Sequence, residues 1–306
     1  MPRFQHLPSQ PSVISTVVSM SDKLTFAHLT DLHIGDPDTA DPGLMTDTNT
    51  TVAAVLDKIG RMQPAPAFVV VSGDIVNRGD EASYRAAKAI FESAALPMPV
   101  VFALGNHDAR GPFYRVMLGR DGNDTRPYDH DVVVAGLHVI VLDTSRPGRI
   151  AGDLDPAQLD WLAGCVAAEP GRRKLIVMHH GPMLDEGEPD AAWQSIGSEA
   201  TARLREIVEG RMDIAGILSG HIHYDRVTSW YGIPLVVGIG QHNATDVLFL
   251  DRGMRALAGA SFAVGTLRPS GLTVSFVPHL PEAPELAVTE SLAFAALIAR
   301  FDGAAE

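Results

Sequence analysis

The chain has 306 residues, of which 46% are hydrophobic and 20% are charged, a composition typical of a globular protein with a sizeable core. Its formal net charge of −13 argues against a large nucleic-acid-binding surface, because phosphate backbones require a basic footprint. The single cysteine, Cys165, excludes an intramolecular disulfide, so no oxidising compartment is required. Cys165 lies in an apolar helical pattern and is expected to be a buried structural thiol.

The first twenty residues lack the continuous apolar stretch and the small-residue cleavage site of a secretory signal. We therefore expect residues 1–22 to form a disordered leader, and Met20 is an alternative start to Met1. No stretch approaches the roughly 18 consecutive apolar residues of a membrane span. These features predict a cytoplasmic protein with no membrane partner, in which residues 23–306 form a single domain.

Apolar and amphipathic segments alternate from residue 24 onwards. Strands are expected at 24–29, 68–71, 100–104, 137–142, 175–178 and 214–218. Helices are expected from a cap at Thr48 or Asn49, over 81–94, from Asp155-Pro156 to about 168, and from a cap at Ser198. Residues 110–130, rich in Gly, Arg and Asp, are expected to be irregular. Continuous apolar strands between amphipathic helices predict a sheet that is covered on both faces.

The pattern changes after Tyr231 to short strands joined by turns. These strands are expected at 235–239, 261–267 and 272–277. The Pro269-Ser270-Gly271 turn makes the last two a hairpin, and a final helix is expected over about 291–301. The β-rich part from about residue 232 is assigned to the same domain, since no linker or internal repeat precedes it.

Five polar motifs each follow one of the apolar strands. They are Asp31/His33, Asp74, Asn106/His107, His179/His180, and His221/His223 within the sequence Gly220-His221-Ile222-His223. Ligands of open α/β sheets bind outside the carboxyl ends of the strands, so these loops are expected to converge in one crevice. Each motif alone can be explained as a turn or a packed histidine. Five of them in order, each at a strand end, indicate a shared function.

The residue types in these motifs favour metal binding. Imidazole nitrogens with carboxylate and carboxamide oxygens suit Mn²⁺, Fe²⁺, Co²⁺, Ni²⁺ or Zn²⁺, and the lack of thiolates excludes a cysteine zinc cage. Two carboxylates, one amide oxygen and about four imidazoles are too many for one tetrahedral ion, so two ions sharing a carboxylate are predicted. Metals about 4 Å apart can clamp a phosphoryl oxygen, produce hydroxide at neutral pH and stabilise a leaving oxygen.

The order DxH, GD, GNHD, H and GHxH between residues 24 and 243 resembles the calcineurin-like metallophosphoesterase superfamily. The sequences Met178-His179-His180-Gly181-Pro182 and Gly73-Asp74-Ile75-Val76-Asn77 resemble its class III cyclic nucleotide phosphodiesterase and glycerophosphodiesterase branch. The resemblance implies an α/β fold, namely a four-layer α/β/β/α sandwich with a dinuclear metal site. It also implies hydrolysis of small phosphodiesters, such as cyclic nucleotides, glycerophosphodiesters or organophosphate diesters, by in-line attack of a metal-bound hydroxide.

The resemblance further implies a role for each motif residue. The implied ligands are Asp31, His33 and His223 for the first metal, Asn106, His179 and His221 for the second, and Asp74 as the bridge between them. His107 would contact the phosphate and protonate the leaving alkoxide, and Asp108 would orient His107 through its other ring nitrogen. Between the two adjacent histidines, His179 is assigned as the ligand because it directly ends the strand, and His180 is the alternative.

Further residues are expected close to the substrate. Candidates for substrate contacts are Arg110, His242 and Asn243, together with Asn106 and His107. The alternative for His242 and Asn243 is a polar turn packed over the loops. Phe113 and Tyr114 are candidates to cap the pocket, whereas His28, inside the first strand, is expected to be a packed core histidine. Asn77 stands where purple acid phosphatases place a tyrosine ligand, so a tyrosinate–iron site is not expected.

Two other functions compete with this hypothesis. One is a phosphomonoesterase or nuclease of the same superfamily, but the acidic balance argues against long nucleic acids, and a monoesterase would require extra cations for the second phosphate charge. The other is a non-catalytic metal-binding module, against which the complete ligand set and His107 argue. The ions are expected to be Mn, Fe, Zn or Co. Because relatives of this branch associate through C-terminal strands, a homo-oligomer formed by the β-rich part is expected.

Overall fold

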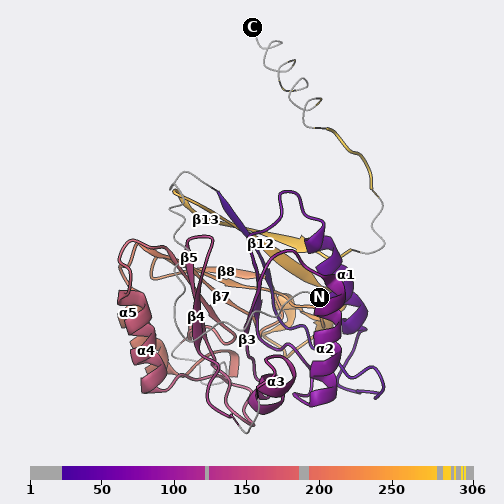
Figure 1. Ribbon diagram of the computed structural model, residues 1–306, viewed down its shortest axis with the longest axis horizontal. Coiled ribbons are helices and arrows are strands. Elements are labelled where there is room, and N and C mark those ends of the chain that lie inside the picture. Colours follow the sequence, from indigo (N-terminus) through magenta and orange to yellow (C-terminus); the bar gives the residue numbers. More distant parts are fainter. Residues whose placement is uncertain are drawn as a thin grey trace.

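The computed structural model describes residues 23–120, 124–185, 193–280, 285–290 and the single positions 293, 298 and 300. The predicted leader at 1–22 and most of the predicted final helix lie outside these residues. Within them, two β-sheets lie face to face between two layers of helices, with α4 and α5 on one outer side and α1 and α2 on the other (Figure 1).

The first sheet, as far as the chain is described, has the strand order β13-β12-β1-β2-β3. Its strands are β1 (Leu24–Leu29), β2 (Val69–Ser72), β3 (Val100–Ala103), β12 (Ser261–Arg268) and β13 (Gly271–Pro278). The first three run parallel, and β12 pairs antiparallel with β1. The predicted hairpin is confirmed, since Arg268 pairs with Gly271 across the turn.

The second sheet has the order β4-β5-β6-β7-β9-β8 among the described residues. Its strands are β4 (His130–Val134), β5 (Leu137–Leu142), β6 (Lys174–Met178), β7 (Ile214–Ser219), β8 (Arg226–Trp230) and β9 (Ile233–Val237). The edge strands β4 and β8 escaped prediction because their side chains alternate between more and less exposed positions and form no continuous apolar run. A short ribbon of β10 (Ala244–Thr245) and β11 (Ala256–Leu257) flanks the 3-10 turn η2 (Val247–Phe249).

The helices largely follow the sequence pattern. They are α1 (Thr48–Gly60), α2 (Glu81–Ala94), α3 (Arg110–Val116), α4 (Pro156–Ala167) and α5 (Ser198–Val208). Two predicted caps were wrong by one or two positions: Asp47 caps α1 by accepting from the Thr50 N–H, and Gly197 precedes α5. α3 lies in the segment expected to be irregular. At α4 the predicted start is confirmed by a capping box between Asp155 and Gln158.

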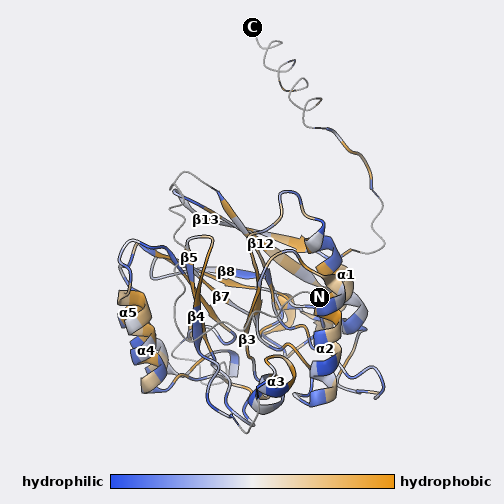
Figure 2. Cartoon of the chain, in the orientation of Figure 1, coloured by the Kyte–Doolittle hydropathy of each residue, from blue (hydrophilic) through white to orange (hydrophobic). Residues whose placement is uncertain are grey.

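Three buried clusters hold the layers together. One lies between α1, α2 and the first sheet, one between the two sheets, where Phe26 stacks on Phe68 with ring centroids 5.2 Å apart, and one under α4 and α5. Full burial of each such large apolar side chain contributes about 1.5–3 kcal/mol. Figure 2 shows the strands mainly in hydrophobic colours, whereas the helices carry both kinds. The predicted four-layer sandwich is therefore confirmed.

Candidate metal centre

The loops that follow β1, β2 and β7 have an unusual backbone. Five of their motif residues have positive φ angles, although none is glycine: Asp31 (49°), His33 (44°), Asp74 (49°), His221 (77°) and His223 (54°). Such residues are uncommon, and each costs about 1–3 kcal/mol unless the surrounding structure holds it in place. The surrounding structure therefore holds these loops in a strained backbone conformation, which sets the direction of the five side chains.

Glycines allow the loops to approach each other closely. A Cβ at Gly220 would overlap the Thr30 hydroxyl, and a Cβ at Gly105 would overlap the Asp74 carboxylate. At Gly73, which has a φ of 107°, a Cβ would lie 2.5 Å from the ring of His179. The glycines of the GD, GNHD and GHxH motifs are therefore required by packing between neighbouring loops, within the first sheet at Gly105 and across the two sheets at Gly73 and Gly220.

Two carboxylates and three imidazoles converge at the carboxyl ends of the strands. Asp31 Oδ1 lies 3.2 Å from His223 Nε2 and 3.9 Å from the Nε2 atoms of His33 and His179. Asp74 Oδ2 lies 3.2 Å from His179 Nε2 and 3.7 Å from His33 Nε2. All five side chains are buried except for part of His223. The predicted convergence of the first, second, fourth and fifth motifs is confirmed.

Each of these imidazoles is oriented by an oxygen atom on its outer side. The Nδ1 of His33 donates to Asn77 Oδ1 (3.0 Å), that of His179 to the Ser72 carbonyl (2.9 Å), and that of His223 to Asn243 Oδ1 (3.1 Å). In the neutral rings this leaves the Nε2 lone pairs pointing into the cluster.

The ring of His221 is turned the other way. Its Nε2 donates to the carbonyl of Trp193 at 2.8 Å, so in the neutral ring Nδ1 carries the lone pair. Trp193 played no part in the sequence analysis, because a main-chain carbonyl has no residue-specific signal. The ring centroid of His221 lies 5.2 Å from that of His179.

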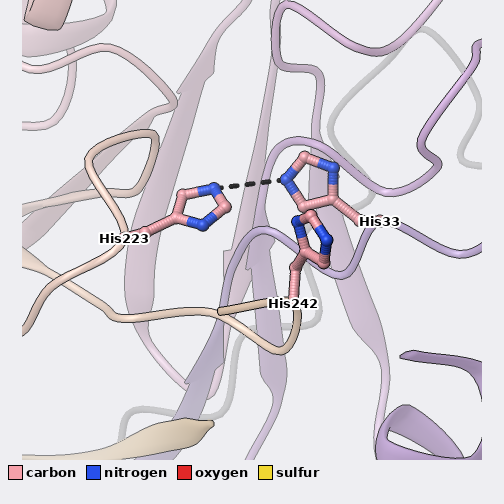
Figure 3. Close-up of side chains that lie close together, drawn as sticks. All are labelled: His33, His223 and His242. Atoms are coloured by element: carbon pink, nitrogen blue, oxygen red, sulfur yellow. Dashed lines mark hydrogen bonds between the residues drawn. The ribbon is translucent and has the colours of Figure 1, made fainter. Parts of the chain in front are cut away.

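Several polar atoms here lack the partners that burial requires. The Nε2 atoms of His33 and His223 face each other at 3.2 Å (Figure 3), and two lone pairs at this distance repel unless a proton or a metal ion lies close by. Asn106 Oδ1 is buried without a hydrogen-bond partner in the described part of the chain, which costs about 1–3 kcal/mol. The donor set therefore fits divalent metal ions.

The charges of the cluster also favour the binding of divalent metal ions. Burial lowers the pKa of His33 to about 3 and that of His221 to about 4, so both rings are neutral at pH 7, as metal ligands must be. Burial opposes ionisation of Asp31 and Asp74, but His223 and His179 hold the pKa of these two carboxyls below the usual range. Against burial, Asp74 and Asp31 raise the pKa of His179 to about 9. Positive charge is thus favoured between the two carboxylates.

His180 offers no free nitrogen. Its Nε2 donates to the Ile150 carbonyl at 2.9 Å, and its Nδ1 accepts from the Thr144 hydroxyl at 2.8 Å. Its ring lies close to those of His179 and His221, but proximity alone does not make it a ligand. The geometry therefore favours His179 over His180.

The role expected for Asp108 was wrong. Its carboxylate accepts from the N–H groups of Gly105 (2.9 Å) and Ile75 (3.1 Å) and from the hydroxyl of Tyr84 (2.8 Å), so it ties two loops together. His107 instead directs Nδ1 to the carbonyl of Asn77 at 2.7 Å. Burial, followed by the charge of Asp74, raises the pKa of Asp108 to about 7.

Arg110, Phe113 and Tyr114 were expected close to the substrate, but each has contacts within the protein. Arg110 donates to Asp143 (2.9 Å) and to the Ser145 carbonyl (2.9 Å), so its guanidinium is bound within the protein. Phe113 and Tyr114 are buried in the core rather than capping a pocket. This segment forms α3, and its two aromatic side chains pack into the cluster between α1, α2 and the first sheet. The sequence pattern did not indicate this helix.

Three residues of the rim have distinct surroundings. His242 Nε2 accepts from the Met45 N–H at 3.0 Å, so Nδ1 carries the ring proton, and its ring lies 5.0 Å from that of His33 (Figure 3). Asn243 orients His223 through its side-chain oxygen and was expected instead to contact substrate. His107 is exposed at the same rim, with its ring 4.6 Å from that of His33.

Asn77 is the functional residue that the sequence analysis missed. It accepts from His33 through Oδ1 and from His107 through its main-chain carbonyl. Its Nδ2 donates to Asp41 at 2.7 Å, and Asp41 also binds Arg78 through both carboxylate oxygens. Its place three residues after Asp74 was a signal, but one that was used only to exclude a tyrosine ligand.

The two residues expected to be structural behave differently from each other. His28 is buried and bonds to Ser72 Oγ at 2.8 Å, which confirms that it is a packed core histidine. Cys165 is only partly buried, beside the cluster under α4 and α5. Burial nevertheless raises the pKa of its thiol to about 12, so Cys165 is not an activated nucleophile.

Comparisons with known proteins all identify phosphoesterases as similar to this chain. The family model described as calcineurin-like phosphoesterase matches residues 24–225. A probable cyclic nucleotide phosphodiesterase of Rhodococcus erythropolis is 32% identical over 218 residues, covering 70% of each chain. A cAMP/cGMP dual specificity phosphodiesterase of Mycobacterium tuberculosis is 29% identical over 76% of this chain and 72% of its own. A glycerophosphodiester phosphodiesterase of Enterobacter lignolyticus is 27% identical over 68% and 73%, respectively.

Solved structures support the fold. The purple acid phosphatase from yellow lupin seeds superposes with a TM-score of 0.61 at 14% sequence identity, covering 84% of this chain and 52% of that chain. At this identity the similarity concerns the fold alone. Among the described residues, no helix has the length and apolar character that crossing a membrane requires.

Proposed function

We propose that this chain, which belongs to the calcineurin-like phosphoesterase family, hydrolyses small phosphodiesters with the help of bound divalent metal ions. One observation carries the proposal: Asp31 lies within 4 Å of His33, His179 and His223, and Asp74 within 4 Å of His33 and His179, measured between ligand atoms. The names of its relatives, cyclic nucleotide and glycerophosphodiester phosphodiesterases, favour a diester as the substrate.

Two ions fit the donor set better than one. We assign Asp31, His33 and His223 to the first ion and Asn106, His179 and His221 to the second. Asp74 is assigned as the bridge, because its Oδ2 faces both His33 and His179. When bound, such ions neutralise the phosphate charge and activate water.

His107 is proposed to act as the general acid. Its Nδ1 donates to the carbonyl of Asn77, so Nε2 is the atom that gives a proton to the leaving oxygen when the ring is charged. Exposure of His107 at the rim leaves room for a leaving group.

His242 is proposed to contact the phosphate. Because its Nε2 accepts from the main chain of Met45, the proton on Nδ1 is available to a non-bridging oxygen. The ring lies within 5.0 Å of His33 and 6.1 Å of His223, measured between ring centroids. His242 would thus orient the substrate beside the metal ligands.

The experiment is a steady-state assay of the Mn²⁺-reconstituted protein on bis(p-nitrophenyl) phosphate and p-nitrophenyl phosphate, repeated with Fe²⁺, Zn²⁺ and Co²⁺. We expect preference for the diester and loss of activity on chelation. A preference for the monoester would instead identify a phosphomonoesterase. No turnover of either compound, with metal content shown by elemental analysis, would identify a non-catalytic metal-binding module.

Homo-oligomerisation remains part of the proposal. β13 is the outer strand of the first sheet in the described chain, and an unpaired edge is a surface onto which a second copy can pair. Sedimentation velocity tests this expectation, and a monomer at assay concentrations would contradict it.

A further inference from the structure

A cavity of about 490 Å³ lies beyond the residues assigned to the metal centre. Part of its wall is the loop after β5, from Arg146 to Asp153, and the other part includes Met183 and Gly197. The lining combines apolar surface from Pro147, Ala151 and Met183 with the side chains of Arg146 and Arg149. A cavity of this size accommodates an organic group of nucleotide size.

His180 forms the partition between this cavity and the metal ligands. Gly152, which lines the cavity, lies directly against the His180 ring, since a Cβ there would overlap it. The opposite side of the partition is occupied by His179 and His221, whose ring centroids lie 4.8 and 4.4 Å from that of His180. Both nitrogens of His180 are used to hold the loop through Thr144 and Ile150. One side chain thus separates the cavity from the proposed ligands.

The lining of the cavity carries two arginines. Arg146 and Arg149 have no ion pair within the described ranges, whereas Arg110 and Arg78 each bind a carboxylate. The carboxylate of Asp153 in the lining accepts from the Leu154 N–H, and no ion pair joins it to either arginine. In a chain of net charge −13, a cavity whose described lining holds two guanidinium groups and one carboxylate has a local excess of positive charge.

We infer that this cavity binds a second anionic group of the substrate, an inference that rests on the proposed phosphodiesterase function. Guanidinium groups match the geometry of phosphate and carboxylate, and the apolar wall suits the organic arm between the two anions. The substrate class is therefore a phosphodiester whose arm ends in a further phosphate or carboxylate. A dinucleotide with a terminal phosphate belongs to this class, and a simple cyclic nucleotide does not.

The test uses a matched pair of ligands, the dinucleotides ApA and 5′-phosphorylated pApA, as inhibitors of bis(p-nitrophenyl) phosphate hydrolysis by the full chain. We expect pApA to bind about tenfold more tightly than ApA, as one charged hydrogen-bonded contact provides. The double variant R146Q/R149Q should remove this difference and leave turnover of the small diester unchanged. The control R61Q/R85Q, which removes an equal charge from the exposed Arg61–Asp57 and Arg85–Glu81 pairs, should retain it.

Equal inhibition by ApA and pApA in the wild type, or an unchanged ratio in R146Q/R149Q, would overturn the inference while leaving the proposed function intact. Absence of turnover of bis(p-nitrophenyl) phosphate would instead count against the proposed function. In that case calorimetric titration of pApA and ApA into the same variants gives the affinity ratio directly, and the same criteria decide.

Discussion

Charged groups are buried at both ends of the second sheet, and the two clusters differ in how they are satisfied. At the amino end of β6, the fully buried Lys174 donates to Asp213 (3.0 Å) and to two main-chain carbonyls. Arg211 binds the same Asp213 through two nitrogens. Where the carboxyl ends of both sheets meet, by contrast, Asn106 Oδ1 has no partner among the described residues, and the Nε2 atoms of His33 and His223 face each other.

This difference separates a structural ion pair from a binding site. A buried charge that serves stability finds its partners within the chain, because each unpaired group costs free energy. A site for an ion keeps acceptors in excess, and the surrounding structure must hold them there. The left-handed residues of the carboxyl-end loops have the same explanation.

The largest effect is expected from Asp74→Ala. This change removes the carboxylate that faces both His33 and His179, so we expect metal and diesterase activity to be lost together. Elemental analysis and the bis(p-nitrophenyl) phosphate assay measure the two losses on one sample. Retention of two ions by an inactive variant would contradict the bridging assignment.

His107→Ala should keep the ions and lower the rate by about 10²–10⁴-fold, the usual contribution of a general acid. The loss should be greatest with an alkyl leaving group, since p-nitrophenolate needs little protonation. The ratio of kcat values on an alkyl and an aryl diester measures this. Equal losses on both substrates would contradict the general-acid role of His107.

At the amino end, Asp213→Ala should cost about 3–5 kcal/mol of unfolding free energy, because the buried Lys174 loses its charged partner. Lys174→Met is the matched control and should be close to neutral, since Asp213 keeps Arg211. Urea unfolding measures both. A similar loss in the two variants would show that the ion pair itself, rather than an uncompensated charge, determines stability.

Asn77→Ala should weaken metal binding by about 10–100-fold, the usual effect of removing a residue that orients a ligand. The reason is that His33 loses its acceptor at Nδ1, while the main-chain carbonyl that holds His107 remains. Competition with a chelator measures the affinity, and saturating metal should restore most of the rate. An unchanged affinity would leave Asn77 with a purely structural role.

The smallest effect concerns pH. The side chain of Arg211, assisted by Lys174, lowers the pKa of Asp213 to about 2. A depressed carboxyl pKa contributes stability above its unfolded value near 4, and this contribution is lost as the pH falls towards 2. The difference in unfolding free energy between the wild type and Asp213→Asn should therefore shrink between about pH 4 and pH 2. A constant difference would contradict the assigned shift.

The sequence alone was sufficient for the parts of the fold that repeat a simple pattern. Continuous apolar runs located the buried strands β1, β5, β6 and β7, and periodicity located α2 to the residue. Half-exposed edge strands carry no such signal, so β4 and β8 were missed. The cap of α5 was assigned to Ser198, but Gly197 occupies that position.

The residues proposed to bind the metal ions could also be predicted from the sequence, because chemistry restricts which residue types bind a divalent ion and topology places strand ends together. The surroundings of these ligands were not. The partners of Asp108, Arg110, Asn77 and Asn243 depend on which loops touch across the two sheets, and no spacing within one segment encodes such contacts.

What the sequence by itself determined, then, is the kind of protein: the layered α/β fold and the histidine and carboxylate set for metal ions. Tertiary structure decided which of two adjacent histidines points inward. His179 and His180 follow the same strand, but successive side chains leave a strand on opposite faces. One imidazole therefore reaches Asp74 between the sheets, and the other is held by Thr144 against the wall of the neighbouring cavity.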